Sequence, residues 1–167
     1  MKKEYKVGGY VKLAKLWERS RDAAIAYHNE YYRSKFQNDP KMCLCDVYID
    51  ITGNKEIRRR KQMLRLLGDC MAGKINCIAT QTRAYLAANN EEFFHLIHLL
   101  FSLEPSIEIV TEDLDYNIDT IRDEDDQRDA MKKMAADYVN MNPATYKKWK
   151  DNILRGIETQ QQEQSKK

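Results

Sequence analysis

Two polar loops carry the side chains of this sequence that are best suited to chemistry, and each follows an apolar run. The first loop begins after Asp50 and leads into four consecutive cations, R-R-R-K at 58–61. The second follows residues 75–80 and contains Arg83. Guanidinium groups match phosphate oxygens in a bidentate way, so one interpretation of these cations is phosphate binding. The other is a solvated basic face, and the residues alone leave both interpretations open.

Strand and helix patterns alternate through the first two thirds of the chain. Apolar runs rich in β-branched and aromatic residues predict strands over 5–13, 42–51, 75–80 and 106–110. Helical spacing predicts helices over 17–32 and 59–72, and a third that starts at the cap Asn89–Asn90 and ends before Pro105. This alternation predicts an α/β fold with a mostly parallel sheet of four or five strands. Both polar loops then leave the carboxyl ends of strands, where ligands gather in such sheets.

The last third of the chain has a different pattern. Residues 113–126 are strongly acidic and predict a loop, and residues 127–158 predict a long helix that is interrupted near Pro143. Asn142 can cap the helix that resumes there, with Pro143 in its first turn. The polar tail 159–167 predicts disorder. The expected organisation is an α/β domain over 1–112, the acidic loop, the interrupted helix for dimerisation or partner contact, and the tail.

Composition narrows the class of protein. A formal net charge of +2 over 167 residues gives no global nucleic-acid signature, so DNA contact would have to come from local basic clusters. No apolar run approaches the roughly 20 residues that a membrane span needs, and the first residues lack the apolar core of a signal peptide. Four cysteines without metal-ligand spacing favour a reducing environment. We therefore expect a cytoplasmic protein that has no contact with membranes.

Cysteine, histidine and glycine are not spaced as in known metal or nucleotide sites. Cys43 and Cys45 lie two apart on a predicted strand, and we expect the cysteines to be buried free thiols. His95 and His98 are three apart, unlike the i, i+4 pair of zinc proteases. The glycine pair at 8–9 matches neither a dinucleotide motif nor a P-loop. We expect no metal and no cofactor.

The order of these pieces resembles the N-terminal catalytic domain of the serine site-specific recombinases, the resolvase/invertase family, over about residues 5–158. That family's first strand ends in Y-x-R-x-S, whose serine attacks the DNA phosphate, and the matching segment here is Y-V-K-L-A at 10–14. Its second strand ends in an aspartate, here Asp50, and an arginine precedes the next helix, here Arg60. Its third strand leads into D-R-x-x-R, here T-R-A-Y-L with Arg83. The resemblance implies a resolvase-like three-layer domain with a long C-terminal helix.

Four departures fall on the positions that carry the family's chemistry. Ala14 stands at the nucleophile position and has no hydroxyl, so it cannot form a phosphoserine link. Lys12 replaces the arginine of the first strand. Thr82 and Leu86 replace the aspartate and the second arginine of D-R-x-x-R. The resemblance therefore implies a degenerate catalytic site.

That degenerate site gathers residues from three strand ends. Its expected members are Ala14, Lys12, Arg60 and Arg83, with Arg60 and Arg83 facing a common pocket beside Ala14. The residues expected to contact phosphate or the DNA backbone are Arg58, Arg59, Arg60, Lys61 and Arg83.

The function that the resemblance implies is a recombinase-like pseudoenzyme that does not cleave DNA and has an accessory, regulatory or dimerisation role. Its expected partners are a second copy or an active recombinase, with weak contact to the DNA backbone. Base-specific readout is not expected, because no helix-turn-helix or zinc ribbon follows. Two alternatives stay open: a protein-interaction module with no DNA role, and an active recombinase in which Ser20 or Ser34 serves as nucleophile.

Overall fold

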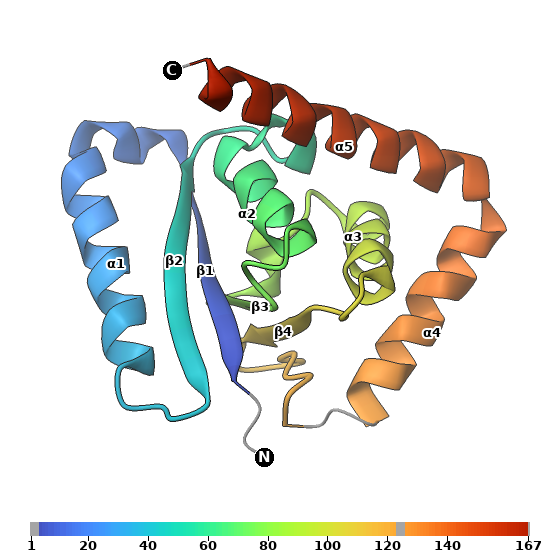
Figure 1. Cartoon of the computed structure of the whole chain (residues 1–167), viewed down its shortest axis with the longest axis horizontal. Coiled ribbons are helices and arrows are strands. Elements are labelled where there is room, and N and C mark those ends of the chain that lie inside the picture. The colour runs from blue at the N-terminus through green and yellow to red at the C-terminus, as the bar shows by residue number, and fades with distance from the viewer. Residues whose placement is uncertain (1–3, 123–125, 167) are drawn as a thin grey trace.

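One parallel sheet forms the centre of the molecule in the computed structural model, which describes residues 4–122 and 126–166 (Figure 1). Its strands are β1 (Tyr5–Leu13), β2 (Met42–Ile51), β3 (Cys77–Thr80) and β4 (Glu108–Thr111). They lie in the order β2-β1-β3-β4, and all three pairings are parallel. The predicted α/β class and the parallel sheet are confirmed, and the sheet has four strands.

Helices cover both faces of this sheet and make three layers. The helix α1 (Arg21–Phe36) packs on one face, against a cluster that includes Val7, Val11 and Tyr32. The helices α2 (Lys61–Met71) and α3 (Asn90–Ser102) pack on the other, with Tyr10 and Tyr48 in their cluster. Apolar side chains on both faces of a strand are what a sheet covered on both sides requires.

Glycine in the central strand allows α1 to approach closely. A Cβ built on Gly9 would lie 2.9 Å from ring atoms of Tyr32, a distance that real Cβ atoms essentially never show. The glycine pair in β1 therefore serves packing.

Three short 3-10 helices follow the first three strands at the carboxyl edge of the sheet: η1 (Lys15–Ser20), η2 (Ile57–Arg59) and η3 (Arg83–Tyr85). The helix predicted from residue 17 begins only at Arg21. Residues 14–23 are all exposed, and the buried stripe of α1 starts at Ala24. Without a buried face, η1 has no packing that would favour the α-helical form, because most helical stability comes from such a face.

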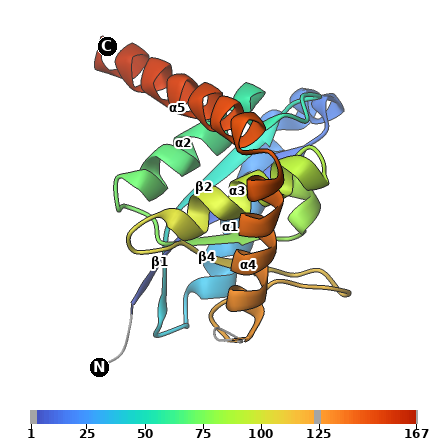
Figure 2. The ribbon, with the colours of Figure 1, turned by 90° about the vertical axis from the view of Figure 1, so that its right-hand side faces the viewer.

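The C-terminal segment forms two helices, α4 (Asp126–Met141) and α5 (Pro143–Ser165), which lie outside α2 and α3 (Figure 2). The predicted interruption is confirmed: the Asn142 side chain accepts a hydrogen bond from Thr145 N at 3.3 Å, and Pro143 opens α5. Ile153 and Ile157 are buried against the core. A Cβ on Gly156 would lie 3.1 Å from Leu64, so α5 crosses α2 closely.

Residues 159–165, which we expected to be disordered, continue α5. Two physical reasons account for the difference. The Gln160 side chain donates to Lys61 O at 2.9 Å, which fixes the helix above α2. The rest of the tail is rich in glutamine, glutamate and lysine, which are good helix formers. Residue 167 lies outside the described residues.

The acidic segment begins with ordered residues. Thr111 and Ile118 exchange two hydrogen bonds, from Thr111 N to Ile118 O at 2.7 Å and from Ile118 N to Thr111 Oγ1 at 2.9 Å. Thr120 is fully buried. Residues 118–120 therefore fold back along β4. Part of the predicted acidic loop, residues 123–125, lies outside the described residues.

Candidate functional site at the carboxyl edge of the sheet

The end of β1 places the predicted nucleophile position at the surface. Alternation along the strand puts Tyr10 and Lys12 on the side that faces α2, and Lys12 is in register with Asp50 of β2. Ala14 follows directly, is exposed, and opens η1, with its carbonyl accepting from Trp17 N at 3.0 Å. A methyl group at this place offers no nucleophile.

Asp50 is buried and its carboxylate is already occupied. It accepts from the Tyr10 hydroxyl at 2.8 Å and from the backbone N–H groups of Gln62 and Met63, each at 2.9 Å. Those two N–H groups belong to the first turn of α2, whose N-cap residue Arg60 makes no side-chain cap. Asp50 therefore caps α2 from the neighbouring strand, which satisfies donors that a helix start leaves unpaired. With three donors bound, it is poorly placed to act as a general base.

Tyr10 is no substitute nucleophile. Burial and then the Asp50 carboxylate raise the pKa of its hydroxyl well above the usual value. The phenol is fully buried and stays protonated at neutral pH.

Arg60 is 1% exposed, and it joins the two loops that we predicted to carry the chemistry. Its Nε donates to Lys55 O at 3.1 Å, and its terminal nitrogens donate to Lys55 O and Tyr85 O. The guanidinium thus connects the loop after β2 with the loop after β3. Phosphate binding by Arg60 stays a prediction, and it requires these loops to separate first.

Lys12 lies close to two other cations. Its pKa is lowered, first by burial, then by the positive charges of Arg60 and Lys55, while Asp50 works in the opposite direction. An anion bound at this place would relieve the repulsion.

Arg83 turns away from this cluster. Its guanidinium donates to Tyr116 O at 3.4 Å and lies 5.6 Å from the centre of the Tyr116 ring. Its backbone N–H and the Thr82 hydroxyl both donate to Asp113, at 3.0 and 2.8 Å. Although burial opposes the change, these hydrogen bonds lower the pKa of Asp113. The common pocket expected for Arg60 and Arg83 is therefore not formed, because each guanidinium has its own carbonyl partners.

The other predicted cations lie at the surface beside η2. Arg58 and Arg59 approach Glu56 at 2.6 and 3.9 Å, and their side chains are about half exposed. Exposed pairs of this kind contribute little to stability. Lys61, the first residue of α2, is exposed as well. These cations remain accessible to a ligand.

A buried carboxylate that sequence reasoning missed, Glu92, holds this edge together. Glu92 accepts from Ile57 N at 3.1 Å, Ala88 N at 3.0 Å and Trp149 Nε1 at 2.9 Å. It connects η2, the start of α3 and α5. Its position in the first turn of α3 predicts only a favourable dipole contact, and its partners are distant in the sequence.

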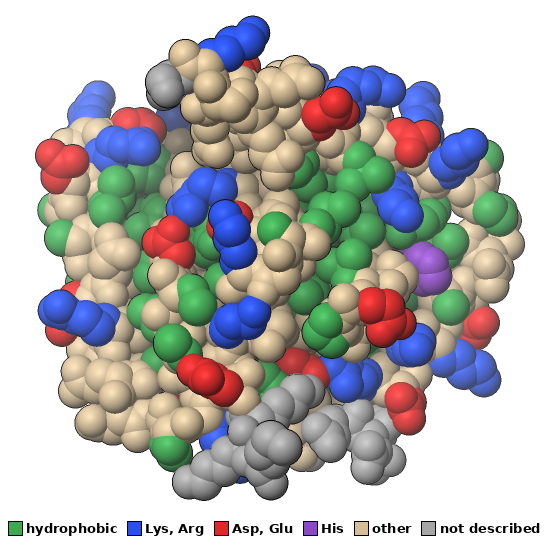
Figure 3. All heavy atoms as spheres, viewed as in Figure 1, with side chains coloured by type: hydrophobic (Ala, Val, Ile, Leu, Met, Phe, Trp, Pro, Cys, Tyr) green, Lys and Arg blue, Asp and Glu red, His purple; other side chains and the backbone are tan. Residues whose placement is uncertain are grey.

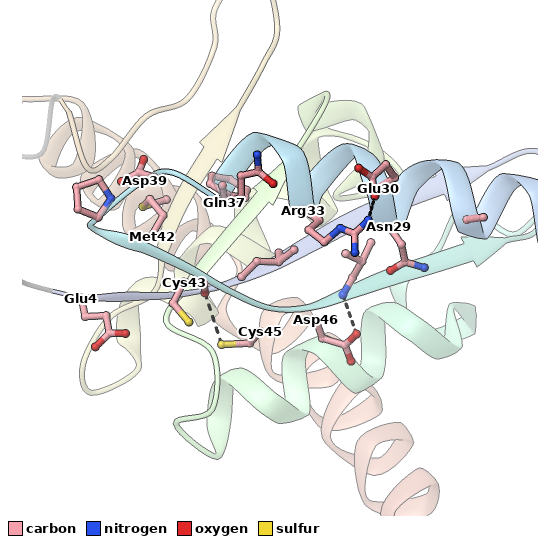
Figure 4. Close-up of a pocket in the computed structure, with 15 residues that line it drawn as sticks. Glu4, Asn29, Glu30, Arg33, Gln37, Asp39, Met42, Cys43, Cys45 and Asp46 are labelled. Carbon is pink, nitrogen blue, oxygen red and sulfur yellow. Dashed lines mark hydrogen bonds and ion pairs between the residues drawn. The ribbon is translucent and has the colours of Figure 1, made fainter.

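Two cavities are lined by residues other than Ala14 and its neighbours in η1. One of about 760 Å³ lies between α1 and the first half of β2, near the amino edge of the sheet (Figure 4). Cys43 and Cys45 line it and are exposed, contrary to the expected burial, because they occupy the start of an edge strand. Cys70 and Cys77 are buried free thiols as expected, and burial raises the pKa of both. A second cavity, of about 680 Å³, lies between α3 and α4 with Arg83 at its rim.

Within residues 4–122 and 126–166, no cluster of three or more His, Cys, Asp and Glu side chains could hold a metal ion. His95 packs instead among aromatic rings, with its ring centre 5.4 Å from that of Trp149 and 5.5 Å from that of Tyr146. In the same described ranges, no helix is both long and apolar enough to cross a membrane.

Comparison with known proteins identifies the fold. The chain is similar to the crystal structure of the N-terminal catalytic domain of TP901-1 integrase, with a TM-score of 0.56 and 16% sequence identity. The match covers 83% of this chain and 96% of that domain. No family model and no curated protein matches the sequence. At this identity the likeness defines the fold: the chain has the α/β architecture of an integrase catalytic domain.

Proposed function

We propose that this chain is a serine recombinase-like domain with an accessory role in DNA site-specific recombination, and that it does not cleave DNA itself. The observation that carries the proposal is Ala14: in a fold like that of an integrase catalytic domain, a methyl group stands at the end of β1 where the resemblance expects the attacking serine. Phosphoryl transfer through a covalent intermediate needs a nucleophile at that place.

The surroundings of Ala14 support the same proposal. Positioned cations around the phosphate lower the barrier of phosphoryl transfer. Here Arg60 is bound to two carbonyl groups, and Arg83 is turned towards Tyr116. Leu86, at the position of the family's second arginine, is fully buried in the core. Restoring a hydroxyl alone would leave the phosphate without its cations.

Ser20 and Ser34 do not favour the alternative of an active enzyme. Ser20 ends η1, and the Ser34 hydroxyl donates to Glu30 at 3.0 Å on α1. Neither residue lies at the end of a strand. The alternative of an interaction module would need an exposed apolar face on the C-terminal helices. Their apolar residues Ala135, Val139, Ile153 and Ile157 are instead buried within this chain. Met134 and Met141 of α4 remain exposed.

The test combines an adduct assay with a binding assay. The protein is incubated with supercoiled plasmid and with end-labelled random duplexes. A denaturing gel then detects covalent adducts, and a native gel of the same mixtures detects non-covalent binding. We expect no relaxed plasmid and no protein–DNA adduct, together with a duplex mobility shift that weakens steeply as salt rises. A denaturation-resistant adduct contradicts the inactive site. A protein that shifts no duplex at low salt contradicts the DNA role and favours the interaction module.

Self-association and pairing belong to the same proposal. Sedimentation of the chain alone, and of the chain mixed with an active serine recombinase, measures both. A complex in either sample agrees with the accessory role, and monomers in both samples over the micromolar range contradict it.

A further inference from the structure

The segment that joins β1 to α1 is exposed along its whole length. Every residue from 14 to 23 is exposed, including two large apolar side chains, Leu16 at 72% and Trp17 at 45%. We call residues 14–23 the exposed connector. Single exposed apolar residues are ordinary on a protein surface, but an adjacent leucine and tryptophan without a buried neighbour in their own helix call for a function.

The exposed connector lies beside the basic loop. Thr52 N donates to Leu13 O at 3.0 Å, so the chain leaves β1 and β2 side by side at the carboxyl edge. Segments 12–21 and 53–61 together carry nine lysines and arginines against two glutamates. The whole chain has a net charge of only +2. On the face drawn in Figure 3, basic and acidic side chains are interspersed.

The two glutamates already have partners. Glu18 pairs with Arg21 at 2.9 Å, and Glu56 pairs with Arg58 at 2.6 Å. Asp50 is bound by three donors. The carboxylates of this edge therefore do little to neutralise Lys12, Lys15 and Lys55.

The positive charge and the exposed indole of this surface favour a nucleic acid over a protein as its ligand. A protein partner would have to desolvate many like charges around Trp17, whereas the cores of protein interfaces are depleted of charged residues. A strand of nucleic acid instead supplies phosphates for the cations and a base face for the indole. Stacking of bases on aromatic side chains beside a basic groove is the usual mode of binding single strands.

We propose that Leu16 and Trp17 form a stacking platform for an unpaired base of single-stranded DNA, whose phosphates contact Lys12, Lys15 and Lys55. This inference rests on the proposed association with DNA and adds a class of substrate to it: unpaired bases, in addition to the duplex. The rise of a 3-10 helix, about 2 Å per residue, puts the Cα atoms of Trp17 and Ala14 about 6 Å apart. The stacked base would thus lie next to the position of the missing nucleophile.

The experiment uses the full chain and a fluorescein-labelled 12-nucleotide oligo-dT, with binding measured by anisotropy at several salt concentrations. Trp17→Ala should bind roughly tenfold more weakly, because stacking is lost. Tyr27→Ala is the matched control, since Tyr27 is a 63% exposed aromatic on α1, and it should bind as the wild type does. Lys15→Gln should weaken binding and flatten the salt dependence.

A second measurement reports on Trp17 directly. The chain has two tryptophans, and the other, Trp149, donates to the buried Glu92. Oligo-dT should quench the fluorescence of the wild type, and Trp17→Phe should abolish the quenching. Equal affinities of wild type and Trp17→Ala, or quenching that persists in Trp17→Phe, overturns the stacking platform. If the stacking platform is overturned but the protein still shifts duplex DNA in a salt-sensitive way, the proposed function stands and only this inference fails. If the protein binds neither single-stranded nor duplex DNA, both proposals fail.

Discussion

The two halves of the carboxyl edge differ in how their polar groups are satisfied. On the α2 side, Tyr10, Asp50 and Arg60 are buried, and all three side chains are hydrogen-bonded. The Tyr10 hydroxyl donates to Asp50, and Arg60 donates to the carbonyls of Lys55 and Tyr85. We call these three residues the saturated network. On the α1 side, the exposed connector buries no side chain. The comparison shows that the buried polar groups of this edge hold the structure together: Asp50 caps α2, and Arg60 connects the loops after β2 and β3. The accessible cations lie beside η2 and on the segment that follows Ala14.

The sharpest way to break the saturated network is Asp50→Ala. The change leaves two N–H groups of α2 and the Tyr10 hydroxyl without their acceptor, and each buried unsatisfied group costs about 1–3 kcal/mol. We expect a loss of about 3–5 kcal/mol in the free energy of unfolding, measured by urea denaturation monitored by circular dichroism. Glu56→Gln is the control, because Glu56 is an exposed carboxylate, and it should leave the free energy of unfolding nearly unchanged. Similar midpoints for the two variants would show that Asp50 does not cap α2.

Arg60→Lys tests the connection between the loops. A lysine ammonium has no fork with which to reach Lys55 O and Tyr85 O together, so the buried charge loses hydrogen bonds. We expect a loss of about 2 kcal/mol in the same denaturation experiment, and faster amide exchange at η2 and η3. Arg58→Lys, two residues away and half exposed, should leave both readouts unchanged. An Arg60→Lys variant with unchanged stability and unchanged amide exchange would contradict the structural role of Arg60. It would favour the interpretation that Arg60 is a cation that binds a ligand.

Arg60 also shows which features of the structure the sequence alone does not predict. Apolar residues that recur with the period of a strand or of a helix predict the alternating strands and helices, and from them the parallel sheet. The residue types at Asn142–Pro143 predict the interruption of the last helix. All of these signals are local in the sequence. In the run R-R-R-K, nothing local tells which arginine turns inward. Burial of Arg60 depends on the carbonyls of Lys55 and Tyr85, which only the tertiary fold brings within reach.

The same limit explains the exposed connector. Trp17 fits a helical pattern with the residues after it, and that pattern predicts a helix that begins at Trp17. Its exposure depends on what packs against η1, and no residue of η1 is buried. Glu92 is the opposite case, a charged residue that three distant donors pull into the core.

Lys12 lies between the two halves and can sharpen the comparison. Its pKa in the folded state is lowered, so the charged lysine costs folding free energy below that pKa. The cost is present at pH 7, and it fades as the pH rises through the folded-state pKa towards the unfolded value of about 10.4. After allowance for solvent screening, Lys12→Gln should stabilise the protein by about 0.5 kcal/mol at neutral pH and low salt.

The difference between Lys12→Gln and wild type should shrink at pH 10–11, because Lys12 loses the charge that burial and the nearby cations disfavour. High salt should reduce it only in part, because salt screens the repulsion from Arg60 and Lys55 but leaves the cost of burial. Lys15→Gln, which is fully on the exposed connector, serves as the control and should show no such gain. A Lys12→Gln variant that is less stable than wild type at pH 7 would mean that Lys12 belongs to the saturated network.

The smallest expected effect is that of Ala14→Ser, and it bears most directly on the proposed function. Ala14 is exposed and has φ −64° and ψ 152°, a conformation that serine adopts freely, so stability should change by less than about 0.5 kcal/mol. The new hydroxyl gains no base, because Asp50 is occupied, and no free cation from Arg60 or Arg83. We therefore expect no covalent adduct with labelled duplex DNA.

Adding the family's remaining residues to Ala14→Ser should not restore cleavage either. Leu86 is fully buried, so Leu86→Arg places an unpaired charge in the core, and Thr82→Asp sets a carboxylate beside Asp113. Asp22→Ser, which places a serine at another exposed position of the connector, is the control for adduct formation. An adduct with Ala14→Ser that Asp22→Ser does not form would show that the surroundings of Ala14 can still activate a nucleophile. In that case the degeneracy would be confined to one side chain, and the saturated network would have to open when DNA binds.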